Sequence, residues 1–208
     1  MEFASEMAVK ATIHQLKISE VPTTLAVDGR DRAPYLNTWS DGWRHLRFLL
    51  IYSPRWLFLY PGLLAMLFGI LIMLLLIPGP RMIGELELDV HTMLFAAMTI
   101  ILGQSAVSFS LFSKIFAIGA KLVPRDERVE QMLRILNLER GLLCGFILVI
   151  LGVIGALYAV MIWGTAEFGP LNQAEVLRVV IPSLTGMAVG FQLMLSSFFI
   201  SVLMLGHK

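Results

Sequence analysis

The feature that most constrains this chain is a stretch from Trp56 to Ile77 without a single charged side chain. At about 1.5 Å per residue, a helix of this length spans roughly 33 Å, which is enough to cross a hydrocarbon core of about 30 Å. A helix buried in a soluble domain seldom stays apolar on every face over so many turns. Arg55 precedes the stretch, and residues 78–81 (PGPR) end it, as expected at two membrane–water interfaces. The sequence therefore predicts a membrane protein.

Three later stretches repeat this pattern, and the composition agrees. Residues 92–113, 141–166 and 179–206 contain no Asp, Glu, Lys or Arg. Hydrophobic residues make up 57% of the chain and charged residues 15%, and the mean hydropathy is +0.79, unlike an ordinary soluble domain. We predict four transmembrane helices, close to residues 56–77, 92–116, 141–164 and 179–205.

The N-terminal segment has the pattern of a soluble domain. Residues 1–15 place Phe3, Met7 and Ala11 on one helical face, and residues 16–25 (LKISEVPTTL) have the β-branched composition of a short strand. A single strand cannot satisfy its own backbone hydrogen bonds. Either the strand joins another chain, or the sequence begins in the middle of a domain, and we favour the second interpretation.

A juxtamembrane segment at residues 38–55 leads into the first span. Trp39 and Trp43 share one helical face with two leucines further along, and Arg44 and Arg47 lie on the remaining arc. This pattern predicts a helix in the plane of the membrane, with its aromatic side chains toward lipid and its cations toward headgroup phosphates.

We therefore expect an all-α membrane protein in which amphipathic interfacial helices accompany the four spans. A helix-strand remnant of an α/β domain and a basic loop occupy residues 1–37, the juxtamembrane helix occupies residues 38–55, and a four-helix transmembrane domain occupies residues 56–208. A cytoplasmic amphipathic helix at residues 124–140 connects the second and third spans.

The distribution of Lys and Arg predicts the orientation. Seven precede the first span, six lie between the second and third spans, and one is at the C-terminus, whereas the two other loops hold only Arg81 and Arg178. By the positive-inside rule, both termini are expected in the cytoplasm. The net charge of +1 does not show this, because the rule depends on where the cations lie.

Small and polar residues in the spans indicate how the helices pack. Pairs of small residues four apart occur at Gly186/Gly190, Gly152/Ala156, Gly155/Ala159 and Ala65/Gly69. We favour packing within one chain over contacts between copies, which would make a homo-oligomer. The second span is the most polar and contains Gln104, Ser105, Ser108 and Ser110. Interhelical hydrogen bonds explain it more simply than a substrate path. The charge-free stretches contain no Asp, Glu, Lys, Arg or His, and only the thiol of Cys144 is noted among weaker ionisable groups, which argues against ion-coupled transport.

The sequence predicts no catalytic residue, cofactor site or metal site, and no nucleic-acid partner. Residues 85–91 (ELELDVH) alternate three carboxylates and a histidine that could bind a divalent cation, but a solvated acidic loop is the simpler explanation. His14 has no Ser, Cys or carboxylate placed by the sequence to work with it. Phosphate-binding, dinucleotide-binding, metalloprotease and hydrolase motifs do not occur in the sequence.

Residues 1–62 resemble a known family. MEFASEMAVKA, then LKISEVPTTL, then DGRDRAPYLNTWSDGWRHLRFLLIYSPRWLFLYPG resemble the junction between the catalytic and membrane domains of bacterial family 2 glycosyltransferases. The most similar group is the polyprenyl-phosphate (dolichol-phosphate-like) sugar transferases. MEFASEM matches their last catalytic-domain helix, Glu20-Val21-Pro22 matches the final strand, and the four spans fit in a general way.

In that family, a GT-A domain binds a nucleotide sugar and a divalent metal such as Mg or Mn, and it passes the sugar to a membrane-embedded lipid phosphate. The resemblance implies that this chain anchors such an enzyme and presents polyprenyl phosphate for cell-envelope glycan synthesis at the bacterial inner membrane. Arg30, Arg32, Arg44 and Arg47 are the expected contacts of the lipid phosphate. The commoner family pattern has a basic residue and Gly-Ser-Lys after the last strand, where this sequence has Arg30 and Arg32 instead.

The donor-binding half of the family does not precede Met1, so we expect this chain to transfer no sugar alone and to need a GT-A domain in cis or in trans. A truncated gene product, a pseudogene product and a split enzyme all fit the sequence. Two other classes stay open. One is a non-enzymatic four-span scaffold or lipid flippase subunit; the other is a module that recruits a soluble transferase by adding its strand to the partner's sheet.

The orientation can be tested with single cysteines in a chain whose Cys144 is replaced by alanine. Glu87→Cys and Gly169→Cys should react with a membrane-impermeant thiol reagent in intact cells, because both loops are poor in cations. Arg128→Cys should react only after the membrane is permeabilised. Labelling of Arg128→Cys alone in intact cells would show that the orientation is inverted.

Overall fold

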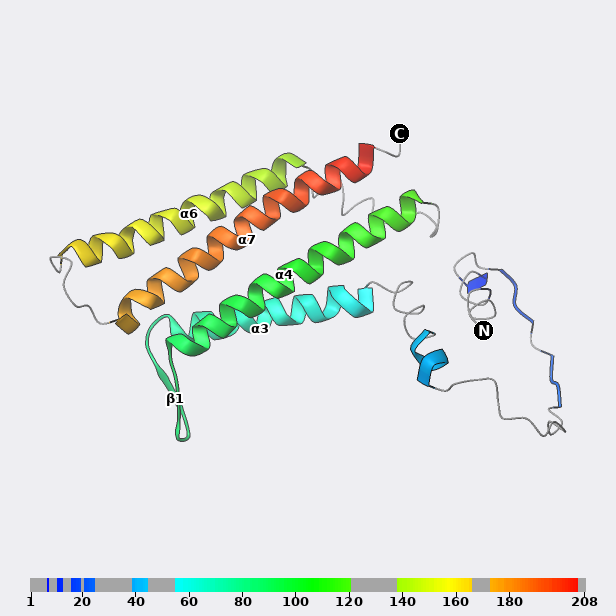
Figure 1. The fold of residues 1–208 in the computed structure, drawn as a ribbon, viewed down its shortest axis with the longest axis horizontal. Helices are drawn as coiled ribbons and strands as arrows, with labels where there is room; N and C mark the ends of the chain where they lie inside the picture. The colour runs from blue at the N-terminus through cyan, green and yellow to red at the C-terminus, as the bar shows by residue number, and fades with distance from the viewer. Residues whose placement is uncertain are drawn as a thin grey trace.

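The computed structural model describes residues 7, 11–12, 16–19, 21–24, 39–44, 55–120, 138–165 and 173–205. These residues include four helices that are long and apolar enough to cross a membrane (Figure 1). Their bounds are Arg55–Leu59 for the π-helix η1, which continues into α3 at Tyr60–Leu76, Val90–Gly119 for α4, Leu138–Thr165 for α6 and Gln173–Leu205 for α7. The predicted all-α membrane protein with four spans is confirmed.

The ends of the helices differ from the predicted ones. The prediction ended each span near a charged residue, but α7 already begins at Gln173 and includes Glu175 and Arg178. A helical backbone continues past the hydrocarbon boundary because its hydrogen bonds do not depend on the surrounding solvent. The first span begins as a π-helix because Pro61, at the first turn of α3, has no N–H to donate to the preceding turn.

A β-hairpin connects α3 and α4 where the sequence analysis expected a loop. Its strands are β1 at Arg81–Ile83 and β2 at Leu86–Leu88, and they pair antiparallel. Gly84 has a φ of +63°, a left-handed conformation that glycine adopts without steric cost. A two-residue turn with glycine first matches the twist of a hairpin. The signal was therefore Gly84-Glu85 between two short runs of strand-forming residues.

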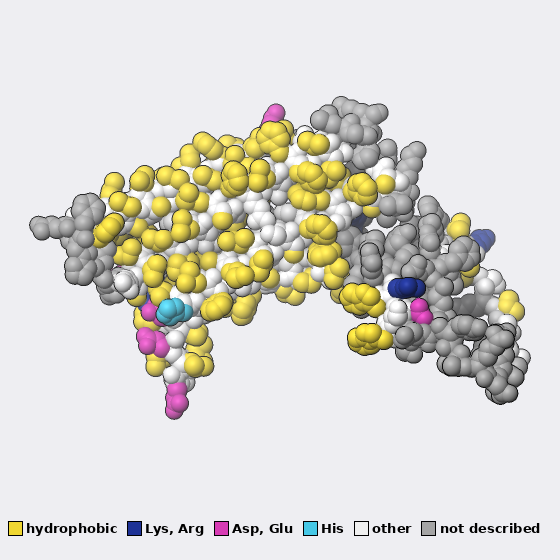
Figure 2. Space-filling view, viewed as in Figure 1, with side chains coloured by type: hydrophobic (Ala, Val, Ile, Leu, Met, Phe, Trp, Pro, Cys, Tyr) yellow, Lys and Arg dark blue, Asp and Glu magenta, His cyan; other side chains and the backbone are white. Residues whose placement is uncertain are grey.

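The four spans lie side by side in a row rather than in a closed bundle (Figure 1). The order is α3, α4, α7, α6, since α4 packs against both α3 and α7, and α6 packs against α7. The buried hydrophobic core lies where α3, α4 and α7 meet near the hairpin. Its residues are Met73, Leu76, Val90, Met93, Ala96, Ala97, Ile100 and Ile181. The surface in view is densely apolar, as expected for helices surrounded by lipid (Figure 2).

Glycines let neighbouring helices approach until their backbones touch. A Cβ on Gly145 of α6 would lie 2.6 Å from the carbonyl oxygen of Gly190 in α7. A Cβ on Gly69 of α3 would lie 2.7 Å from the carbonyl oxygen of Ala96 in α4. Backbone contacts of the same kind are made at Gly62, Gly103 and Gly152. Of the predicted small-residue positions, Gly69, Gly152, Gly155 and Gly190 make close contacts within the chain, as we favoured, whereas Gly186 does not.

The described N-terminal residues give a mixed result. Residues 7 and 11–12 are helical, as predicted. Residues 16–19 and 21–24 are exposed, and the structure pairs them with no strand in the part of the chain that it describes. A lone strand without a neighbour has no ladder to join, which is the reason that no strand forms there. Of the amphipathic helix predicted at residues 124–140, the part up to residue 137 lies outside the described residues, and the remainder is the first turn of α6.

Gly186 and Gly190 of α7 form a matched pair for testing the helix contact. A Cβ at Gly190 would overlap the backbone of Gly145, whereas the nearest atom to a Cβ at Gly186 is 3.8 Å away. Overlap in a packed contact costs about 1–3 kcal/mol, and alanine gains up to about 1 kcal/mol of helix propensity over glycine. Gly190→Ala should therefore lower the thermal unfolding temperature in detergent, while Gly186→Ala leaves it unchanged or raises it. Equal unfolding temperatures for the two variants would contradict this packing.

Candidate functional site

The four arginines predicted to contact lipid phosphate are only partly covered by the structure. Arg44 lies in the described helical segment 39–44 and is exposed. Arg30, Arg32 and Arg47 lie outside the described residues. The structure therefore shows the environment of one of the four arginines, and the grouping of all four stays a prediction.

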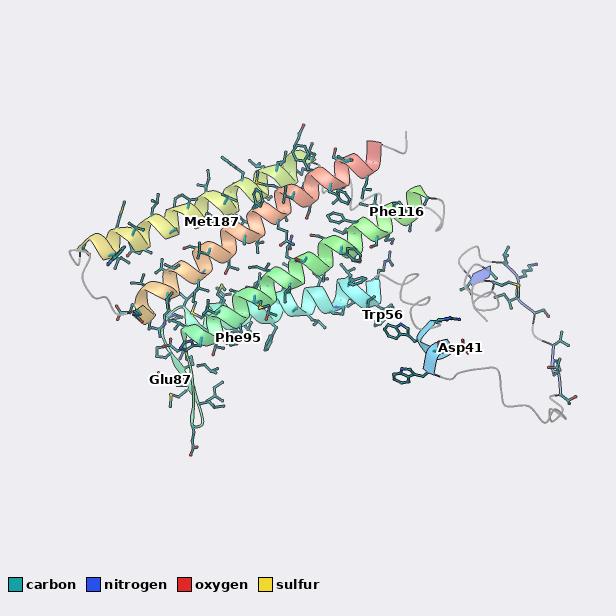
Figure 3. All side chains as sticks on the ribbon, viewed as in Figure 1. Asp41, Trp56, Glu87, Phe95, Phe116 and Met187 are labelled. Carbon is teal, nitrogen blue, oxygen red and sulfur yellow. The ribbon has the colours of Figure 1, made fainter. Side chains whose placement is uncertain are left out.

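The segment that carries Arg44 has the surface of an interfacial helix. Trp39 and Trp43 are 88% and 61% exposed, and their spacing of four residues puts them on one helical face. Figure 3 marks this short helix by the label of Asp41. Indole rings prefer the headgroup level of a membrane, and a guanidinium beside them faces phosphate there. The described residues thus fit the predicted helix in the membrane plane.

A second group of aromatic side chains surrounds the beginning of the first span. The rings of Trp56 and Tyr60 have centroids 5.0 Å apart, and Phe58 meets Phe109 of α4 edge to face at 4.9 Å. Aromatic side chains of this kind form belts at membrane interfaces. The Trp39–Arg44 helix and the beginning of the first span therefore both carry aromatic side chains of the kind found at membrane interfaces.

The alternating acidic residues before α4 are spread over the hairpin and the start of the helix. Glu85 and Glu87 are exposed on the hairpin, while Asp89 is bound to Arg178. Among the residues described, no three His, Cys, Asp or Glu side chains are close enough to hold a metal ion. The divalent metal implied by the family resemblance stays an expectation for a GT-A domain.

Polar side chains join α4 to α7 in the middle of the spans. The Nε2 of Gln192 donates to the Oγ of Ser105 at 2.7 Å, and the Oγ of Ser196 donates to the Oγ of Ser108 at 3.1 Å. Gln104, directly before Ser105 in α4, is also buried. These are hydrogen bonds between helices, the simpler of the two explanations for the polar second span. Gln192 was not among the residues predicted from the sequence, although a side-chain amide in a charge-free stretch indicates an interhelical hydrogen bond.

An ion pair links the hairpin ends of α4 and α7, and the sequence did not reveal it. The Nη2 of Arg178 donates to Oδ1 of Asp89 at 2.5 Å, and the two side chains are only 14% and 27% exposed. This hydrogen bond holds the pKa of Asp89 below its ordinary value, with help from the backbone N–H of Val90 and against the effect of burial. The backbone carbonyl of Asp89 also accepts hydrogen bonds from the first turn of α4. The pair therefore ties the start of one span to another.

Comparison with known proteins agrees with the resemblance seen in the sequence. Residues 111–204 match the family described as the glycosyltransferase family 2 C-terminal transmembrane region. The chain is also similar to the low-salt glycan biosynthesis hexosyltransferase Agl6 of Haloferax volcanii, with 28% identity over 205 residues. The aligned residues cover 98% of this chain and 48% of the relative, so the chain spans about half the length of the curated relative that it matches. No solved structure matches the chain. The similarity to the C-terminal membrane portion of family 2 glycosyltransferases is confirmed.

The ion pair can be tested by comparing Asp89→Asn with Glu87→Gln, a neighbouring exposed carboxylate. Because the pKa of Asp89 is lowered by folding, the pair stabilises the protein above its ordinary value of 3.8 and stops doing so as the pH falls through the lowered value. Asp89→Asn should lower the unfolding temperature in detergent at neutral pH, and its difference from wild type should shrink below about pH 4. Glu87→Gln should unfold like wild type at neutral pH. A difference for Asp89→Asn that persists unchanged into acid would refute the role of the charge.

Proposed function

We propose that this chain is the membrane-anchoring and lipid-phosphate-presenting part of a family 2 glycosyltransferase that uses a polyprenyl-phosphate acceptor in cell-envelope glycan synthesis. The observation that carries the proposal is the extent of the similarity. The alignment with the hexosyltransferase relative covers 98% of the chain, so it includes the N-terminal segment as well as the four spans of this protein. Similarity confined to the spans would suit a scaffold of any kind equally well.

The interfacial helix supplies the chemistry that an acceptor phosphate needs. A polyprenyl phosphate keeps its phosphate at headgroup depth, which is the level at which Trp39 and Trp43 hold their helix. Arg44 is exposed on that helix, and a guanidinium can bind phosphate through two parallel hydrogen bonds where lysine acts as a point charge. Arg47, Arg30 and Arg32 complete the proposed phosphate site.

Sugar transfer requires that a phosphate oxygen of the acceptor form a bond to the anomeric carbon of the donor while the bond to the nucleotide diphosphate breaks. In our proposal, the arginines neutralise the acceptor phosphate and fix its depth, so that its oxygen is presented to the donor at a constant position. A GT-A domain in cis or in trans would bind the nucleotide sugar and a divalent metal such as Mg or Mn. Membrane lipids are the other partners.

The proposed location is the bacterial inner membrane, with both termini in the cytoplasm. The first span begins, and α7 ends, on the same side of the layer that the four helices cross (Figure 1). This arrangement fits two termini on one side of the membrane. Among the described residues, Arg55 at the start of η1, Lys114 near the end of α4 and Arg140 in the first turn of α6 lie on that side. The interfacial arginines would then face the compartment that contains nucleotide sugars.

Arginine-to-lysine exchanges test the phosphate site in a fusion of this chain to a complete family 2 catalytic domain. Arg44→Lys and Arg47→Lys keep the charge but lose the two-pronged geometry, so formation of lipid-linked sugar should fall by roughly tenfold, or about 1.4 kcal/mol, while membrane retention is unchanged. Anchoring to anionic lipid alone, worth about 1 kcal/mol per cation, predicts no such loss.

Arg128→Lys makes the same exchange in the cytoplasmic loop and is the matched control; it should keep full activity. Full activity of both interfacial variants would refute phosphate recognition and leave the helix as an anchor. If the wild-type fusion forms no lipid-linked sugar with any donor, the glycosyltransferase assignment is wrong, and a non-enzymatic scaffold or lipid flippase subunit becomes the better reading.

A further inference from the structure

We infer that the β1–β2 hairpin lies in the membrane interface on its side of the bilayer, with one face against the lipid. This inference does not depend on the proposed function. Two large apolar side chains beside its turn, Ile83 and Leu86, are 65% and 71% exposed. Exposed apolar side chains concentrated in so short an element indicate a surface that is covered by something other than water.

The strand pairing makes the hairpin amphipathic. Met82 lies opposite Glu87, and Ile83 lies opposite Leu86. Because successive side chains of a strand point to opposite faces, Ile83 and Leu86 share one face and Met82 and Glu87 share the other. The face with Ile83 and Leu86 is apolar next to the turn, whereas the face with Met82 and Glu87 carries a carboxylate.

The direction of the hairpin places the apolar face toward the bilayer. Figure 1 shows the hairpin running across the direction of the helices, so it extends along the membrane surface when the helices cross the membrane. Figure 3 places Glu87 on the side of the hairpin that faces away from the helices. The opposite face, with Ile83 and Leu86, then faces the lipid around α3. The hairpin follows directly on the end of α3, where Leu74 and Ile77 are also exposed, so the apolar surface of the span continues into it.

The stability of a hairpin this small also calls for support from lipid. A single pair of strands is marginal in water, and every residue of β1 is exposed. Leu88, at the base of β2, packs against the buried core and fixes the rotation of the hairpin. An apolar layer against Ile83 and Leu86 supplies the missing backing.

The backbone of the hairpin limits how deeply it enters the membrane. Both strands are edges with N–H and C=O groups that no other described strand pairs, and such groups are not tolerated in hydrocarbon. The hairpin therefore stays at headgroup level, where water reaches its backbone and only side chains dip inward. Arg81 is exposed at the base of β1, on the same face as Ile83, and its guanidinium can reach headgroup phosphates there.

Labels on adjacent residues test this placement in the full chain with Cys144→Ala, reconstituted into vesicles of phosphatidylcholine and phosphatidylglycerol. Leu86→Cys and Glu87→Cys each carry an environment-sensitive fluorophore. The label at position 86 should emit at shorter wavelength, should be quenched by nitroxide groups near the headgroups and should resist aqueous iodide. The label at position 87 should show the reverse.

Ile83→Cys and Met82→Cys provide a second pair on the other strand, with the first protected and the second accessible. Equal quenching by iodide within both pairs would overturn the inference. Protection at position 86 that disappears when the protein is diluted with more lipid would also overturn it, because the covering surface would then be a second copy of the chain. If positions 83 and 86 stay protected and positions 82 and 87 stay accessible when the protein is diluted with lipid, the result supports a lipid-facing hairpin.

Discussion

Backbone contact at glycines is the interaction on which the arrangement of the spans depends. Lipid tails are as apolar as the side chains of the helices, so burial of hydrocarbon gives no net drive for helices to associate. Close approach replaces that drive with dispersion contacts and dipole interactions between backbones. Gly145 against Gly190 joins α6 to α7, and Gly69 against Ala96 joins α3 to α4. The protein is thus built from two tightly packed helix pairs.

The junction between these two pairs combines apolar contacts, such as Phe112 with Phe199, with polar ones. Between α4 and α7 the described contacts include Ser105 with Gln192, Ser108 with Ser196 and Arg178 with Asp89. Interhelical hydrogen bonds in membranes are worth about 0.6 kcal/mol on average, so none of them dominates. The Nε of Arg178 is buried without an acceptor in the described structure, which offsets part of the gain from its ion pair. Polar pairing therefore fixes the register of the two helix pairs more than it adds to their stability.

The sequence predicted what depends on local pattern and missed what depends on distant partners. Four charge-free stretches were sufficient to locate the spans, because the length of hydrocarbon to be crossed is fixed. The spacing of Trp39 and Trp43 was sufficient to predict a helix, and residues 39–44 are helical. The partners Asp89 and Arg178 are 89 residues apart, and no periodicity connects them. The hairpin was missed because residues of β2 alternate with carboxylates, and an acidic loop explains that composition equally well.

The open row of helices bears on how a lipid acceptor would reach the proposed site. A closed bundle around its ligand would have to open before a polyprenyl chain could enter. In this protein most of the surface of the spans stays exposed, so an isoprenoid tail can lie against it anywhere along the bilayer. The tail then needs no specific pocket, and selection of the acceptor falls to the headgroup. Under the proposed function, the cations at the interface would carry the recognition, and Arg44 is exposed. In the proposed function, the spans set the depth of the site in the membrane, and the interfacial helix binds the phosphate.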